Sequence, residues 1–240
     1  MTYCVGLLLN EGMVLLSDTR TNAGLDNIAT YRKMFHFEVP SERVIAIMTA
    51  GSLSVTQTTI ARLREAIEDP NATPETSILL APTMLKVAEM VGQTLADVRR
   101  EVDEKLSMAQ GVTASMIVAG QRKGGAMRMF LIYPEGNFIE ATEDTPFLQI
   151  GEHKYGKPIL DRVVTPSTSL QDAQKAVLLS MDSTLRSNLS VGMPLDLCLI
   201  HKDDCKISAT RRIEAGDEAF RAMSEAWSRA LRDGFTQIKV

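Results

Sequence analysis

The sequence predicts an α+β fold in which two antiparallel sheets pack face to face and helices cover each outer surface, a four-layer αββα sandwich. The predicted elements follow the order strands, helix pair, strands, helix pair, strands, helix. Short turns join the strands, which favours antiparallel sheets. We see no repeat, low-complexity segment or linker, so we expect one domain over residues 1–240.

The strands are predicted from apolar runs separated by turn signals. The first two flank residues 10–12 and are expected to form a hairpin, and a second hairpin is expected around residues 202–204. Residues 19–32 are polar and mixed, which predicts a long loop. We expect strands at residues 2–9, 13–18, 33–37, 44–48, 112–119, 127–133, 137–141, 147–151, 195–201 and 205–213.

Helices are predicted where apolar residues recur at three- and four-residue steps. The first begins at Ser52 and ends before Pro70, which cannot continue a helix. The second starts near Pro74-Glu75, carries a long apolar stripe and ends at Gly111. Further helices are expected near residues 154–163, 170–185 and 216–232.

The composition narrows the class of protein. The chain has 240 residues, 45% hydrophobic and 23% charged, which is typical of a soluble globular protein. A formal net charge of -4 argues against nucleic-acid binding. No apolar run approaches the roughly 18 residues of a membrane span, and no signal-peptide pattern opens the chain. The three cysteines fit neither a disulfide framework nor a zinc site, so we expect free thiols and a cytoplasmic location.

The N-terminus carries the clearest chemical signal. Thr2 follows Met1, and methionine before a small residue is normally removed, so only that removal is expected before Thr2 gains a free α-amino group. An α-amino group ordinarily has a pKa of roughly 7.7–8.0 and could accept the proton of the threonine's own hydroxyl. A nucleophile and its general base would then belong to one residue.

Four segments carry a resemblance to a known family. In chain order they are TYCVGLLLNEG, SDTRTNAGLDNIATYRKM, IGEHKYGKPILDR and RSNLSVGMPLDL. Together with the element order, they resemble the proteasome β-type subunits of the N-terminal-nucleophile hydrolases, and most of all the bacterial group called Anbu, the ancestral beta subunit. The resemblance covers the whole chain. It implies an αββα fold, a threonine-type peptidase-like site that needs no cofactor, and self-assembly into rings or open spirals.

The resemblance also implies roles for individual residues. Thr2 would be the nucleophile. Asp18 would pair with Lys33 and orient the site, because a carboxylate beside a buried ammonium keeps both groups charged. Gly51 follows a strand and precedes a helix, where its backbone N–H would bind the oxyanion. The adjacent substrate pocket would be lined by Arg20 and Thr49.

The sequence departs from the proteasome pattern next to the expected site. Asn188 stands where the family carries an Asp that supports the threonine amine, so Ser187 or Ser190 would have to take its place. Glu152 stands where the family carries a Ser, and a carboxylate there would raise the pKa of the amine and make it a poorer base at pH 7. These departures argue against general peptidase activity.

Three functions are therefore open. The first is a threonine hydrolase acting on a peptide or amide bond. The second is a self-assembling scaffold that kept the fold without general peptidase activity, and the third is an amidase or amide-transfer enzyme with a narrow, non-protein substrate. A homo-oligomer is expected, without nucleic-acid or membrane partners. No metal is expected, because the three histidines share no ligand spacing; they are His36, His153 and His201.

Overall fold

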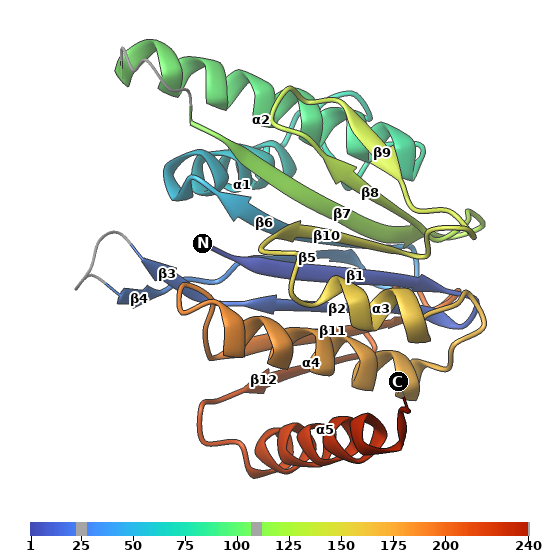
Figure 1. The fold of residues 1–240 in the computed structure, drawn as a ribbon. Coiled ribbons are helices and arrows are strands. Elements are labelled where there is room, and N and C mark those ends of the chain that lie inside the picture. The colour runs from blue at the N-terminus through green and yellow to red at the C-terminus, as the bar shows by residue number, and fades with distance from the viewer. Residues whose placement is uncertain (23–27, 107–111, 240) are drawn as a thin grey trace.

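Two five-stranded antiparallel sheets lie between layers of helices, as predicted (Figure 1). The computed structural model describes residues 1–22, 28–106 and 112–239. The first sheet has the strand order β10-β1-β2-β11-β12. Its strands are β1 (Tyr3–Leu9), β2 (Gly12–Asp18), β10 (Phe147–Gly151), β11 (Leu195–His201) and β12 (Ala209–Ile213).

The second sheet has the order β5-β6-β7-β8-β9. Its strands are β5 (Met34–Val39), β6 (Arg43–Gly51), β7 (Ala114–Arg122), β8 (Arg128–Ile132) and β9 (Phe138–Glu140). A separate two-stranded ribbon joins the sheets in sequence and consists of β3 (Arg20–Asn22) and β4 (Ile28–Thr30). The helices are α1 (Leu53–Glu68), α2 (Met84–Leu106), α3 (Lys157–Val163), α4 (Leu170–Ser187) and α5 (Glu218–Gln237).

Three apolar cores hold the layers together. One lies between the second sheet and α1 and α2, one between the first sheet and α3 and α4, and one between the two sheets. Side chains on alternate faces of each strand supply different cores: on β1, Val5 belongs to the core under α4 and Cys4 to the core between the sheets. Figure 1 shows α5 outside this stack, on the far side of α4.

Several predicted boundaries were wrong, and three of them have a clear physical cause. Residues 19–32 are not a plain loop, because β3 and β4 pair within them. The second long helix begins at Met84 rather than near Pro74: Pro82 disfavours helical backbone before it, and the Thr83 hydroxyl accepts the Lys86 N–H at 3.1 Å as a cap. Its predicted end at Gly111 lies outside the described residues.

The third wrong boundary is the start of the last strand. β12 begins at Ala209, not at residue 205. Asp203 and Cys205 have φ angles of 67° and 48°, which are incompatible with an extended strand. The loop that connects β11 to β12 is therefore longer than the short turn that the sequence suggested.

Candidate functional site

Hydrogen bonds from two directions fix the backbone around Thr2. Its carbonyl accepts the N–H of Glu152 at 2.7 Å, which extends the β1–β10 ladder to the start of the chain. The next N–H, that of Tyr3, is donated to Asp18 Oδ1 at 3.1 Å. Gly151 has φ +80°, and a Cβ there would lie 1.9 Å from the Thr2 carbonyl oxygen, so only glycine allows this approach. Thr2 itself is 7% exposed.

The predicted pair of Asp18 and Lys33 forms a buried ion pair. Lys33 Nζ lies 2.8 Å from Asp18 Oδ1, and the two side chains are 5% and 0% exposed. The β1–β2 hairpin returns Asp18, the last residue of β2, to the beginning of β1. Lys33 immediately precedes β5 in the other sheet, so the ion pair joins the two sheets. Its ammonium also donates to the carbonyls of Arg20 and Met1.

Burial raises the pKa of the Asp18 carboxyl above its ordinary value, while the Lys33 charge and three hydrogen bonds act in the opposite direction. Two of those bonds come from backbone amides: Tyr3 N–H reaches Oδ1 and Gly192 N–H reaches Oδ2 at 3.3 Å. Both carboxylate oxygens therefore have donors. This arrangement holds the Lys33 ammonium in one position, at the floor of the site.

Gly51 presents a backbone N–H toward the same region. Ser52 N donates to Thr113 O on one side of β6, and Thr49 N donates to Lys33 O on the other. Because bonded positions alternate along a strand, the Gly51 N–H points away from β7 and toward the side of Lys33. Gly51 has φ +103°, and a Cβ there would lie 2.3 Å from Thr113 O. The position requires glycine and leaves its N–H free to meet an oxyanion.

Thr2, Lys33, Thr49 and Gly51 line one cavity of about 310 Å³. Its other walls come from the N-terminal residue, the ribbon, the end of β6 and the start of α1. They are formed by Met1, Thr21, Ala50, Ser52, Leu53 and Thr56. Four residues that the sequence singled out therefore lie around one cavity. The first turn of α1, which follows Gly51 directly, adds lining residues that the sequence analysis did not name.

Arg20 does not belong to this cavity wall, contrary to the expectation from the sequence; Thr21 does. Successive side chains of a strand point to opposite faces, so β3 can direct only one of the two toward Thr2. The Arg20 guanidinium instead donates to Leu189 O at 3.0 Å. It lies against Gly192, where a Cβ would come within 2.2 Å of Arg20 Nε. Arg20 thus fixes the loop after α4.

That loop, residues 187–192, reaches the site through its backbone rather than through the predicted side chains. Asn188 Oδ1 accepts the Ser190 N–H at 2.9 Å, so these two residues stabilise the loop itself. Ser187 is the last residue of α4. The Gly192 N–H makes the contact with Asp18. Glu152, the other predicted supporting residue, holds Thr2 by its amide.

Sequence reasoning missed Tyr3, whose phenol lies in a buried polar cluster behind Thr2. Its hydroxyl is 2.6 Å from Ser180 Oγ and accepts the Gln149 side-chain N–H at 2.6 Å. Burial raises the pKa of Tyr3 to about 12. An aromatic residue in an apolar strand gives no sign of such partners, since they come from α4 and β10.

The described residues contain no group of three or more His, Cys, Asp or Glu side chains that could hold a metal ion. In the same part of the chain, no helix combines the length and apolarity needed to cross a membrane. The three cysteines are free and buried.

Comparison with known proteins identifies the family of the chain. A family model described as "Proteasome subunit" matches residues 2–200. No curated protein matched the chain. Among solved structures, an Anbu Gly-1 mutant from Hyphomicrobium sp. strain MC1 has 47% identity and a TM-score of 0.93, with 100% of this chain and 99% of that chain covered.

Two further solved structures come from other bacteria. Anbu (ancestral beta-subunit) from Yersinia bercovieri has 40% identity and a TM-score of 0.91, covering 99% of this chain and 98% of that one. A structure described as the helical assembly of the Anbu complex from Pseudomonas aeruginosa has 43% identity and a TM-score of 0.92, covering 99% and 97%. The chain therefore belongs to the proteasome subunit family and, within it, to the Anbu group.

Proposed function

We propose that this protein is an N-terminal threonine hydrolase that acts on peptide or amide bonds once Met1 has been removed. The observation that carries the proposal is the cavity of about 310 Å³ in which Thr2 lies with Lys33, Thr49 and Gly51. Removing two charges from water costs desolvation free energy, and buried, perturbed titratable groups in clefts are enriched at catalytic sites.

The proposed reaction uses groups of the chain alone. The freed amine of Thr2 takes the proton of the threonine hydroxyl, and Oγ attacks the substrate carbonyl carbon. The Gly51 N–H and the Lys33 ammonium stabilise the negative charge that develops on the oxygens. The C–N bond then breaks, the amine returns the proton to the leaving nitrogen, and an ester forms on Thr2. Water activated by the same amine hydrolyses the ester and restores the hydroxyl.

The test is labelling by a peptide epoxyketone, which reacts with both the hydroxyl and the amine of an N-terminal threonine, followed by intact-mass measurement. We expect loss of Met1 and one adduct per chain, no adduct on Thr2→Ala, and an adduct on Thr2→Ser. Turnover of any substrate by Thr2→Ala would refute the mechanism. Retained Met1 would identify an immature preparation, to be repeated after aminopeptidase treatment.

A second candidate is a self-assembling particle without general peptidase activity. Two observations favour it: Asn188, in place of an Asp, binds its own loop, and the Pseudomonas aeruginosa relative is described as a helical assembly. We propose self-assembly for this chain under either function. Electron microscopy would detect the particle, and a panel of epoxyketones that leaves Thr2 unlabelled after Met1 removal would favour this candidate or a narrow amidase. Buried free thiols fit a reducing compartment, so we also propose a cytoplasmic location.

A further inference from the structure

A larger cavity opens beside the candidate site and has no role in the reaction described above. Its volume is about 860 Å³, and Ala50 and Gly51 line both this cavity and the one that contains Thr2. The two cavities therefore meet at the proposed oxyanion donor. A substrate carbonyl bound at Gly51 has two branches of chain to accommodate, one on its acyl side and one on its leaving-group side, and the two cavities offer one space for each.

The large cavity runs along β10, whose outer edge pairs with no strand among the described residues. Glu152 N donates to Thr2 O, and Leu8 N donates to Pro146 O. In this register the even-numbered residues of β10 are therefore the ones whose backbone groups are hydrogen-bonded to β1. In an antiparallel pair the intervening residues point their N–H and C=O groups outward. In β10 these residues are Phe147, Gln149 and Gly151, and all three line the cavity. The Gly151 carbonyl already accepts the His153 N–H at 2.9 Å, so Gly151 offers an added strand only its N–H.

The direction of β10 decides which branch fits. β10 runs from Phe147 to Gly151, and Gly151 is the end that lies against Thr2. The leaving-group branch of a polypeptide runs from the scissile bond toward its own C-terminus, so along this edge it would travel from Gly151 toward Phe147. It is then antiparallel to β10, the pairing with the better hydrogen-bond geometry. The smaller cavity, which ends at Lys33 and Thr49, is left for the acyl side.

We propose that the large cavity binds the leaving-group side of a polypeptide substrate as an added antiparallel strand on the β10 edge. This inference rests on the proposed function and names its substrate class: an extended polypeptide rather than a small amide. Antiparallel strands pair residue for residue, so the five residues of β10 can pair with about five substrate residues.

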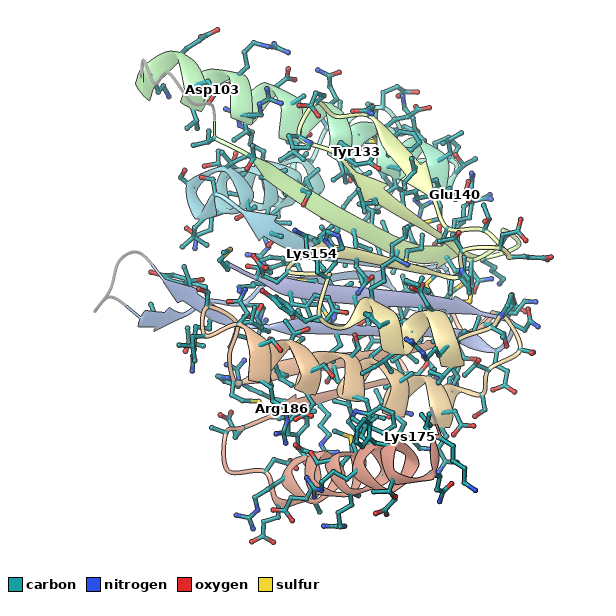
Figure 2. The ribbon with its side chains drawn as sticks, in the orientation of Figure 1. Asp103, Tyr133, Glu140, Lys154, Lys175 and Arg186 are labelled. Atoms are coloured by element: carbon teal, nitrogen blue, oxygen red, sulfur yellow. The ribbon has the colours of Figure 1, made fainter. Side chains whose placement is uncertain are left out.

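The walls of the cavity define the side chains that fit. Tyr133, labelled in Figure 2, follows β8 and lies above β10 in that view, and Leu131 and Ile139 are the apolar neighbours on the same wall. On the α3 side the wall carries the ion pair of Lys157 and Asp161, 2.6 Å apart. Because substrate side chains alternate along a strand, one set faces apolar groups and the other faces charges. The preferred sequence alternates apolar and polar residues.

The experiment uses the assembled protein and synthetic peptides that share one acyl side. Each peptide extends by one to six alternating leucine and serine residues beyond the scissile bond. Wild-type kcat/KM should rise with length and level off at about five residues. Binding is measured separately on Thr2→Ala, with hydrogen–deuterium exchange of residues 144–153. The six-residue extension should slow exchange of the outward amides of Phe147, Gln149 and Gly151.

A matched pair of variants locates the peptide. Ile139 and Leu80 are 46% and 48% exposed, but only Ile139 lines the cavity. Ile139→Glu in the Thr2→Ala background should weaken peptide binding about tenfold, since it replaces an apolar contact with a charge. Leu80→Glu should leave the affinity unchanged.

Three results would overturn the inference. Thr2→Ala could fail to bind the peptide, or it could bind it without any change in hydrogen–deuterium exchange at residues 144–153. The outward amides of β10 could also be protected before peptide is added, because another copy of the chain covers the edge. Cleavage by the wild type without protection along β10 would refute the inference and leave the hydrolase proposal standing. Protection along β10 of Thr2→Ala without cleavage by the mature wild type would support strand binding and refute hydrolysis.

Discussion

Replacing Lys33 with Met would leave the buried carboxylate of Asp18 without its counter-ion. Lys33 and Asp18 are 2.8 Å apart with side-chain exposures of 5% and 0%, so solvent cannot substitute for the lost charge. Breaking a buried ion pair by removing one partner typically costs about 3–5 kcal/mol. Asp18 keeps the amide donors of Tyr3 and Gly192, so the expected loss for Lys33→Met is near the lower end, about 3 kcal/mol.

The pH dependence of that loss has a definite sign. Burial already raises the pKa of Asp18, and removing Lys33 raises it further. A carboxyl whose folded pKa is raised stabilises the fold below its unfolded pKa, about 3.9, and loses that contribution as pH rises through the folded pKa. Lys33→Met should therefore be closer to wild type at pH 5 than at pH 8. Adding Asp18→Asn should recover part of the loss at pH 8, because no buried charge is then left unpaired.

The assay is urea unfolding followed by far-ultraviolet circular dichroism, since urea, unlike guanidinium, does not screen charge. Protein concentration must be constant, because assembly contributes to apparent stability. Equal losses at pH 5 and pH 8 would refute the reasoning. A double variant whose loss equals the sum of the two single losses would also refute it, because the pair would then be uncoupled.

Three further predictions concern residues of the first sheet. Burial raises the pKa of Tyr3 to about 12, so the folded state keeps a proton that the unfolded state loses near pH 10. The stability advantage of wild type over Tyr3→Phe should therefore shrink as pH rises from about 10 to about 12, and a constant advantage would contradict this. Gly151→Ala should lower the melting temperature by at least about 5 °C, because the added Cβ meets the Thr2 carbonyl. Gly216→Ala is the control, since nothing lies within reach of a Cβ there, and it should leave the melting temperature unchanged. Equal melting temperatures for the two variants would disprove the contact. Burial raises the pKa of the Cys198 thiol to about 12. The thiols of native protein at pH 8 should therefore not react with a chromogenic disulfide until the protein is denatured. Fast labelling of the native thiols would argue against their burial.

The element types were predictable because they depend on local signals. Apolar runs between turn residues predicted the strands of both sheets, and the short turn at residues 10–12 returned Asp18 to the start of β1. The helix start at Met84 was missed because the apolar stripe begins earlier than the cap: Pro82 and Thr83 decide the boundary, and periodicity is insensitive to them. The pairing of β3 with β4 lay in a stretch too polar to give a strand signal.

The sequence by itself determined the chemistry available at the site: a threonine directly after Met1, an acid and a lysine able to neutralise each other, and a glycine between a strand and a helix. Tertiary structure decided how they are held. Gly192 N–H and Glu152 N–H reach Asp18 and Thr2 from distant segments of the chain. Such contacts use backbone N–H groups, which every residue except proline carries, so the residue types at these positions do not reveal them. Only the pairing of distant strands determines which amides converge on the site and which edge stays open beside it.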